Sequence, residues 1–569
     1  MVEHQASVAL QSLASRWFRP RSLNQLKNTI MDFQRLFLFL IFSFSLMMVW
    51  DGWQRYQHPQ EIQTAAAVKT VLPVAANPSV TASANSIVEQ SPAIASGKII
   101  TVKTDVLDLQ INTLGGDIQH LDFLQHADGQ DKQKHFVLFE KGAGTHNYVA
   151  QSGLLGAGLP NHTSLFSAGQ DAYVMSGDQL QVKLIAATTN GITVAKLLTF
   201  HKSSYVIEVA YEIINNSPAA LTASAYYQFQ RDGIDPAGGS KMVPTYTGAA
   251  VYTNTEKFQK VSFSDIDKKK AGYPKEADNG WIGMLQHYFV AAWTPKDTLQ
   301  REYFTKSEAG MYTAGVVLPV SAIAPGQTGG ISVPLYAGPT ESKLDSIAPG
   351  LGLTVDYGWL TVIATPIFWT LTFIQGIVKN WGVAIILLTV LIKLLFFPLS
   401  AASYRSMAKM RLVAPKLEKI KAQYADDREK LNKAMMELYK VEKINPLGGC
   451  LPVIIQIPVF IALYWSILAS VEMRNAPFFA WITDLSAADP YFVLPILMGT
   501  SMFLQSKLNP VPPDPIQAKI MKIMPIAFSV VFFWFPAGLV LYSIVNNALS
   551  IAQQWYITRG IEVAGATKH

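Results

Sequence analysis

The sequence has 569 residues, of which half are hydrophobic and only 15% are charged, and its mean hydropathy is +0.21. The length is too great for one ordinary core, and the charged share lies well below the roughly 25% that is usual in soluble domains. The single cysteine, Cys450, excludes a disulfide within the chain and a multi-cysteine zinc site. We therefore expect some segments in lipid and a large soluble part.

The N-terminal part predicts a membrane anchor followed by a linker. Residues 1–30 are polar and mildly basic, and an apolar run within residues 31–53 follows Arg35. A basic flank before a short apolar run indicates either a signal peptide or an uncleaved anchor. We favour the anchor, with its N-terminus in the cytoplasm, because no small-x-small site follows closely. Residues 54–97 are rich in Ala, Ser, Pro and Thr without period, which predicts a disordered linker.

Residues 98–342 predict a large antiparallel β-sandwich that faces water. Short alternating runs recur, such as Ile99 to Leu109 and Leu180 to Ala186. Period-two runs at this spacing are typical of such a sandwich, and Lys, Asp and Asn are frequent between them. The turn signals that separate the runs are Gly115-Gly116, Asn190-Gly191, Gly238-Gly239 and Gly329-Gly330.

The chain after residue 355 predicts a helical membrane domain. Residues 357–379 are apolar but contain Trp and Pro, which favours an amphipathic helix at the membrane interface. Together with the anchor there would be six spans, followed by a cytoplasmic tail at 557–569. The excess of Lys and Arg in residues 404–445 places that segment and both termini in the cytoplasm, and the β domain outside. The further predicted spans are 381–402, 451–471, 491–507, 522–535 and 538–556.

The cytoplasmic segment 404–445 predicts a hairpin of two amphipathic helices. An apolar stripe runs from Met410 to Tyr424 at steps of three and four, and Asp426 with Glu429 resembles a capping box for the second helix. A solvated hairpin that merely connects two spans is one interpretation. The hairpin is much longer than the roughly 2–8 residues that a connection needs, so a docking surface for ribosome, nascent chain or anionic lipid is the other. The candidate docking residues are Arg405, Lys409, Arg411, Lys416, Lys419, Asp426 and Asp427.

One cation, Lys393, lies within the predicted span 381–402. A charge at the centre of a membrane helix costs about 2.5–3.5 kcal/mol, so it needs a wet cavity, a partner, or a path for snorkelling to the interface. No carboxylate occurs in the spans of the helical domain, whereas several amides and hydroxyls do. Each amide alone is typical of helix–helix contacts, but together they favour a shared polar groove. The candidate groove residues are Lys393, Thr389, Gln456, Gln505, Tyr542, Ser543 and Asn546.

A groove of this kind, wet on the cytoplasmic side and closed outside, predicts a function in moving polypeptide ends into the membrane. The cation would attract an acidic or neutral polar tail, while the apolar segment of the substrate partitions into lipid at about 0.8 kcal/mol per buried CH₂. This partition requires no nucleotide, and the sequence contains neither a Walker A motif nor HExxH. We expect no metal, no cofactor and no enzymatic activity.

Several long motifs resemble the YidC/Oxa/Alb family of membrane insertases in its Gram-negative form. The resemblance covers about residues 31–560 and is strongest after residue 355. The motifs are Met31 to Arg35 (MDFQR), Ser406 to Met410 (SMAKM), Asn445 to Pro452 (NPLGGCLP), Gln456 to Pro458 (QIP), Asp484 to Ser486 (DLS), Leu494 to Gly499 (LPILMG) and Phe535 to Tyr542 (FPAGLVLY).

The resemblance implies a five-helix core preceded by an anchor and a periplasmic β-supersandwich, in the bacterial inner membrane. It implies insertion of small membrane proteins by the chain alone and of larger ones with the Sec translocon. The implied partners are nascent inner-membrane proteins, the ribosome, the signal recognition particle receptor and membrane lipids, without direct nucleic-acid contact. It also implies a positive residue in the groove, for which this sequence has Lys393 in place of the usual Arg.

Ser543 also departs from the resemblance, because an aromatic residue usually follows Tyr542. The short tail predicts no ribosome-binding extension, and residues 1–30 have no counterpart, which suggests a start assigned too early.

One rival function is a secondary transporter, which would favour broken helices in paired repeats and a midplane carboxylate. Another is a sugar-active enzyme in the β domain, whose seven histidines show no metal spacing.

Overall fold

The structure, a computed structural model, describes residues 97–566 except 129–130, 143–145, 236–245, 297, 356, 358–359, 425–426, 443, 445–450 and 510–514. The predicted extension 1–30, the anchor 31–53 and all of the linker but Gly97 lie outside the described residues. So do Asp426, Cys450 and the expected turn Gly238-Gly239.

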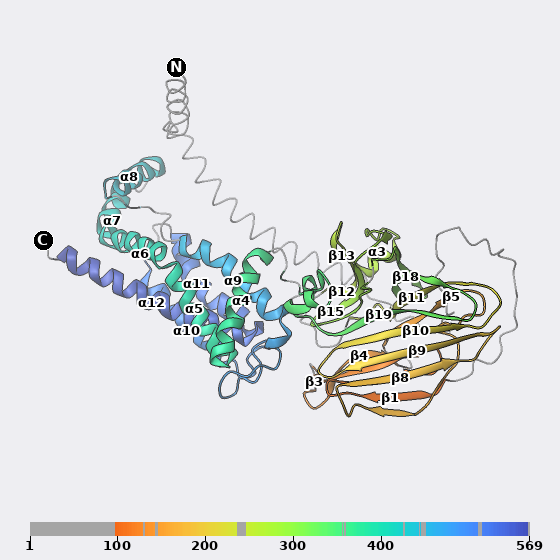
Figure 1. The fold of residues 1–569 in the computed structure, drawn as a ribbon. Coiled ribbons are helices and arrows are strands. Elements are labelled where there is room, and N and C mark those ends of the chain that lie inside the picture. The colour runs from red at the N-terminus through yellow and green to blue at the C-terminus, as the bar shows by residue number, and fades with distance from the viewer. Residues whose placement is uncertain are drawn as a thin grey trace, which may run out of the picture. The chain divides into compact units, whose positions relative to one another are not determined.

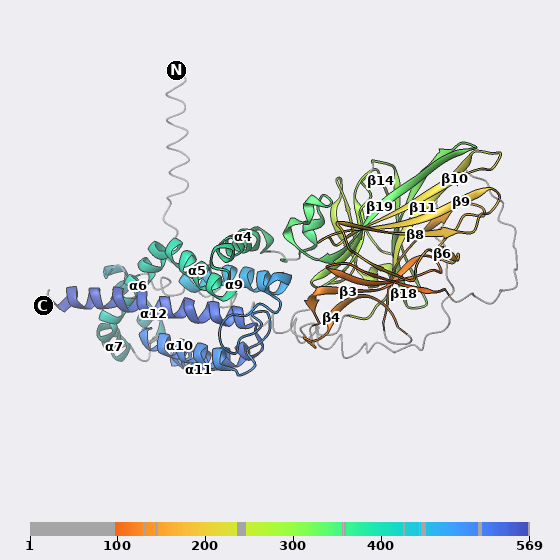
Figure 2. The same cartoon turned by 60° about the horizontal axis from the view of Figure 1, so that its bottom comes forward.

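The first part of the described chain is a sandwich of two sheets, which Figure 2 shows as two layers. One sheet has the strand order β14-β17-β18-β11-β5-β4-β3-β2-β1-β7 and the other β13-β12-β15-β16-β19-β10-β9-β8-β6. Neighbouring strands are antiparallel except β1 and β7. The strands are β1 (Ile99–Lys103), β2 (Leu107–Asn112), β3 (Asp117–Ala127), β4 (His135–Lys141), β5 (Asn147–Leu155), β6 (Phe166–Ala168), β7 (Ala172–Val174), β8 (Gln179–Ala186), β9 (Ile192–His201), β10 (Val206–Asn215), β11 (Leu221–Asp232), β12 (Thr247–Thr253), β13 (Lys257–Val261), β14 (Glu276–Ala277), β15 (Trp281–Gln286), β16 (Phe289–Trp293), β17 (Arg301–Glu308), β18 (Met311–Ile323) and β19 (Gln327–Pro339), with a short helix α3 (Phe263–Asp267).

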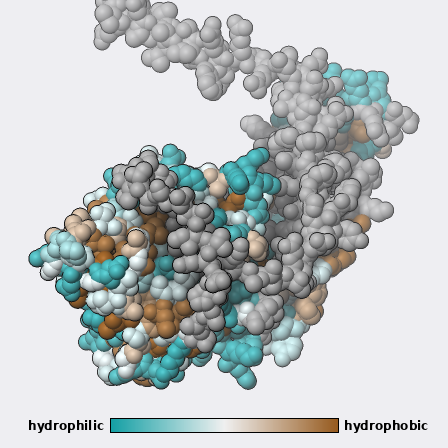
Figure 3. All heavy atoms as spheres, turned by 90° about the vertical axis from the view of Figure 1, so that its right-hand side faces the viewer, coloured by the Kyte–Doolittle hydropathy of each residue, from teal (hydrophilic) through white to brown (hydrophobic). Residues whose placement is uncertain are grey.

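The alternation seen in the sequence produces the core between these sheets. Along β10 every second side chain, from Ile207 to Asn215, is buried, as a period of two requires. Tyr227 of one sheet contacts Trp293 of the other with ring centroids 5.1 Å apart. The predicted antiparallel β-sandwich is therefore confirmed. The face turned to the viewer in Figure 3 mixes hydrophilic residues with small hydrophobic patches.

Two local predictions within the β domain are wrong. The run from Ile99 to Leu109 is not one strand, because Thr104 Oγ1 accepts hydrogen bonds from the backbone N–H groups of Val106 (3.2 Å) and Leu107 (2.9 Å) and closes a turn between β1 and β2. Gly329-Gly330 is not a turn but lies within β19. A Cβ at Gly330 would lie 2.1 Å from the carbonyl oxygen of Tyr211, so Gly330 permits a close approach of β10 and β19.

The second part of the described chain is helical (Figure 1). Its interior includes Leu388, Leu463, Ile467, Leu539 and Val540, all buried in one apolar cluster. Helix α12 packs against α5, α6 and α10, and α4 packs against α5 and α9. The helices are η1 (Ser342–Ser346), η2 (Leu351–Thr354), α4 (Thr361–Val378), α5 (Trp381–Leu395), α6 (Phe397–Leu412), α7 (Ala414–Gln423), α8 (Arg428–Val441), α9 (Leu451–Ala469), η5 (Val471–Met473), α10 (Val493–Leu508), α11 (Pro515–Val531), η6 (Phe532–Trp534) and α12 (Ala537–Ala566).

Helix α4 is apolar on both sides rather than amphipathic. Ala364, Phe368 and Leu371 are buried in the bundle, whereas Trp369 and Phe373 are exposed. Among the described residues, α4 is the one helix that passes by length and composition as a membrane span, and α5 with α6 would be a second if that bent pair forms one span. A helix that is apolar all round is typical of a lipid-facing element. Its predicted place at the interface, like the count of six spans, stays a prediction.

Candidate substrate groove

Helix α5 brings Lys393 to a sharp bend. The helix begins after Asn380, whose side-chain oxygen accepts from the backbone N–H of Val383 at 3.0 Å. It ends at Leu395, and α6 continues at an angle of 68°. Pro398 in the first turn of α6 lacks a backbone N–H, so the two helices cannot share one continuous ladder. The segment predicted as the span 381–402 is therefore bent at residue 396, and its place in a membrane stays a prediction.

The bend changes the surroundings of Lys393. The residue lies in the last turn of α5 rather than mid-helix, and the negative end of a helix dipole favours a cation there. Its ammonium donates a hydrogen bond of 2.7 Å to Ser550 Oγ on α12. Among the described residues no carboxylate forms an ion pair with it. The hydrogen-bond partner of the ammonium among the described residues is therefore a neutral hydroxyl.

A small cavity lies beside Lys393, between the α5–α6 bend and α9. Its volume is about 20 Å³, which is room for about one water molecule and not for a polypeptide. A substrate would thus need these helices to separate. The lining residues are Ile392, Lys393, Phe396, Leu399, Ser400, Ile455, Gln456 and Val459.

Of the predicted groove residues, the structure brings Gln456, Tyr542 and Asn546 near Lys393. Gln456 lines the cavity, and its Nε2 donates to the hydroxyl of buried Tyr542. The backbone carbonyl of Asn546 accepts from Ser550 Oγ at 2.7 Å. The connection to Lys393 thus runs through Ser550 rather than through the Asn546 side chain.

Three predicted residues do not line this cavity. Thr389 and Ser543 are buried, and each hydroxyl donates to the carbonyl four residues earlier in its own helix, at 2.7 Å and 2.9 Å. Such bonds satisfy the hydroxyl without a contact to another helix. Gln505 lies on α10, apart from the lining residues.

Sequence reasoning missed Ser550 and Tyr404. Ser550 is 3% exposed and Tyr404 on α6 is 4% exposed, and the two side chains are hydrogen-bonded to each other. Ser550 follows Asn546 by four residues, which places both on one face of α12. Ser550 could have been predicted by extending the polar positions of the last predicted span from Asn546 by one helical turn.

Some of the candidate cations of the hairpin are exposed, and some form polar contacts. Arg405, Lys409 and Lys419 are exposed. Arg411 Nη2 donates to the carbonyl of Lys507 at 3.0 Å, and Lys416 Nζ lies 2.7 Å from Glu442 Oε1. The exposed cations remain available for docking.

Apolar side chains from the end of α6, from α7 and from α8 form one cluster. Val413 and Leu417 contact Tyr439, with Met435 and Leu438 beside them. The structure has Asp427 as the N-cap of α8, one residue after the predicted Asp426. Asp427 Oδ1 accepts from the backbone N–H groups of the second and third helical residues, at 3.1 Å and 3.0 Å.

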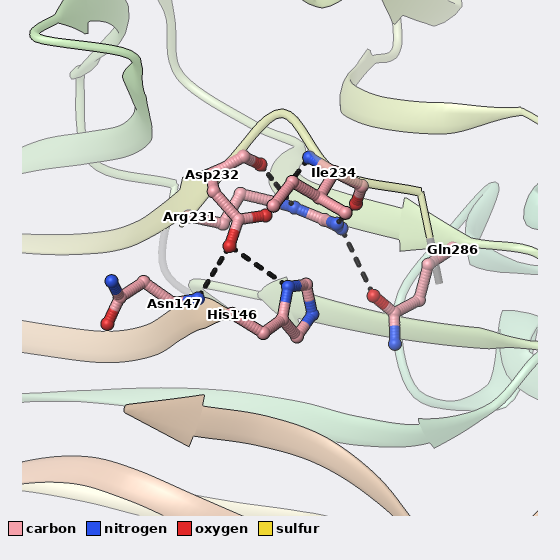
Figure 4. Close-up of polar contacts among 6 residues, drawn as sticks. All are labelled: His146, Asn147, Arg231, Asp232, Ile234 and Gln286. Carbon is pink, nitrogen blue, oxygen red and sulfur yellow. Dashed lines mark hydrogen bonds and ion pairs between the residues drawn. The ribbon is translucent and has the colours of Figure 1, made fainter. Parts of the chain in front are cut away.

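The polar clusters of the β domain do not form a metal centre: the described residues contain no group of three His, Cys, Asp or Glu placed to hold an ion. Figure 4 shows one polar cluster, at His146, Arg231 and Asp232. Fully buried Arg231 donates to Gln286 Oε1 at 3.1 Å and to the carbonyl of Ile234 at 2.9 Å. His146 Nδ1 lies 2.9 Å from Asp232 Oδ2. Burial opposes the charge of Asp232. Hydrogen bonds from His146 and from the backbone N–H of Asn147 nevertheless hold the pKa of Asp232 below the usual range. These contacts connect the ends of strands β5, β11 and β15.

Known proteins match the chain along almost its whole length. The family model described as YidC periplasmic domain matches residues 99–370, and that described as 60Kd inner membrane protein matches residues 373–564. The membrane protein insertase YidC of Methylobacillus flagellatus is 55% identical over 549 residues, which cover 95% of this chain and 99% of that protein. Its counterpart in Nitrosospira multiformis is 54% identical, over 94% of this chain and 98% of that protein. Because two adjoining family models and relatives of this identity span the β domain and the helices alike, the chain belongs to the YidC family of membrane protein insertases.

Proposed function

We propose that the chain inserts and helps to fold inner-membrane proteins through a cytoplasm-facing groove at Lys393, alone or with the Sec translocon. Family membership supports insertion in the inner membrane as the activity. The observation that carries the groove is the Lys393 ammonium, which is bonded to a neutral hydroxyl and is not ion-paired with any described carboxylate.

A cation inside a membrane bundle without an ion-pair partner is costly, so a role in recognition would explain Lys393 better than packing does. An acidic or amide-rich tail of a substrate would complement it. Opening of the small cavity between α9 and the α5–α6 bend would admit the tail, with Gln456 and Ser400 as further polar contacts.

The proposal also includes a path for the apolar segment of the substrate, formed by exposed apolar side chains. Leu497 and Phe503 on α10, with Ile526 and Phe528 on α11, are all about half exposed or more. In the proposed arrangement they face lipid, and the apolar segment of the substrate leaves along them. Each buried CH₂ contributes about 0.8 kcal/mol, so no nucleotide hydrolysis is required.

The proposed topology has six spans, a five-helix core, both termini in the cytoplasm and the β domain in the periplasm. Arg405, Lys409 and Lys419 of the hairpin would face ribosomes, the signal recognition particle receptor or anionic lipids, which exposed cations favour.

The test is reconstitution of the purified chain in liposomes with a short-tailed membrane protein and no nucleotide. Protease protection measures insertion by the wild type, Lys393→Ala and Lys393→Arg, with exposed Lys379→Ala as the matched control. We expect insertion to fall at least about tenfold in Lys393→Ala, since ion-mediated contacts are worth about 1.5–3 kcal/mol, and to persist in Lys393→Arg and Lys379→Ala. Protection by the wild type no better than in empty liposomes would refute insertion, and equal protection by Lys393→Ala would refute the role of the cation.

A further inference from the structure

Ser550 makes contacts that join three helices at the proposed groove. Its Oγ donates to the carbonyl of Asn546 at 2.7 Å, within α12. It accepts from Lys393 Nζ at 2.7 Å, which ties α12 to α5. It is also hydrogen-bonded to Tyr404, which ties α12 to α6 across the bend. Ser550 is 3% exposed, so water does not replace these contacts.

A serine hydroxyl has one donor and two acceptor sites. The bond to Asn546 uses the donor, which leaves a lone pair to accept from the Lys393 ammonium. The hydroxyl is therefore held by its own helix in the orientation that receives an ammonium. A flexible lysine stem would otherwise extend toward the polar interface, where its charge is hydrated.

We propose that Ser550 is a positioning residue that holds the Lys393 ammonium inside the bundle, where the polar end of a substrate can reach it. The inference rests on the proposed function of Lys393. Ser550 does not touch the substrate and acts only through the orientation of the lysine. Loss of the hydroxyl lets the ammonium move away from the cavity, so the positive charge attracts the polar end of the substrate less strongly.

The experiment is a double-mutant cycle on liposome insertion with Ser550→Ala, Lys393→Ala and the double variant. Ser550→Thr keeps a hydroxyl that can bond the preceding turn in the same way. Ser529→Ala is the matched control, because Ser529 Oγ donates to the carbonyl four residues before it on α11. Thermal unfolding in detergent establishes that each variant is folded, and Ser550→Cys, a weaker acceptor of nearly equal volume, replaces Ser550→Ala if the alanine variant is unfolded.

We expect Ser550→Ala to slow insertion about tenfold in the wild-type background, as for loss of a hydrogen bond to a charge, and to change nothing further in the Lys393→Ala background. Ser550→Thr should restore the rate to within about twofold, and Ser529→Ala should match the wild type. Equal slowing in both backgrounds, or faster insertion by Ser550→Ala, overturns the inference. If Lys393→Ala itself inserts normally, the proposed function fails as well, whereas a defect in Lys393→Ala without one in Ser550→Ala refutes only the positioning role.

Discussion

Burial of His162 makes the stability of the β domain depend on pH. The side chain is 4% exposed and its Nδ1 is hydrogen-bonded to the hydroxyl of Tyr226. Burial, and to a lesser extent the nearby Lys196, lowers the pKa of His162 to about 4. In the unfolded chain the pKa of a histidine is about 6.5. The folded state therefore binds this proton less readily, so the stability it contributes is complete above pH 6.5 and is lost as pH falls toward 4.

The magnitude follows from these two pKa values. Between pH 7.5 and pH 5.0 the unfolded state gains about 2 kcal/mol from protonation of this histidine, which the folded state does not share. In the variant His162→Gln that titration is absent. We expect the variant to be less stable at pH 7.5 because it disturbs a buried contact, and the gap to the wild type to shrink by about 2 kcal/mol at pH 5.0.

Urea unfolding of the full chain in detergent, followed by hydrogen exchange of peptides from β11, measures this gap in the β domain itself. Tyr226→Phe is the control, since it removes the hydroxyl but leaves the imidazole buried, and its pH dependence should follow the wild type. A gap between His162→Gln and the wild type that stays constant from pH 7.5 to 5.0 would contradict burial as the cause.

Two further substitutions test local contacts. Buried Asp489 accepts hydrogen bonds that include one of 2.7 Å from the backbone N–H of Leu494. Asp489→Ala should therefore lower the free energy of unfolding by about 2–3 kcal/mol and speed hydrogen exchange at the start of α10. Unchanged exchange there would show that water replaces the carboxylate. A Cβ at Gly330 would lie 2.1 Å from the carbonyl oxygen of Tyr211, where β10 and β19 pair. In urea titrations Gly330→Ala should therefore lower the free energy of unfolding by about 3 kcal/mol. The control Gly177→Ala should be nearly neutral, because the space around Gly177 is open. Equal stability of the two alanine variants would refute the close approach.

The family and the sandwich could both be predicted from the sequence because their signals are local. Alternation along β10 reports which face is buried, since successive side chains of a strand point to opposite faces. The motifs from Ser406 to Tyr542 identify the insertase family in the same direct way, and Lys393 stands out because a charge is rare between apolar neighbours.

Only the tertiary structure decided what surrounds that charge. The bend after Leu395 moves Lys393 from the middle of an expected helix to its end, and the partner of the ammonium, Ser550, lies 157 residues away on α12. The hydroxyls of Thr389 and Ser543, promising in the sequence, bond their own helices instead. Hydrophobic periodicity shows which face of a helix is buried, but it carries no information about which helix packs against that face, and the polar contacts of a bundle depend on that pairing.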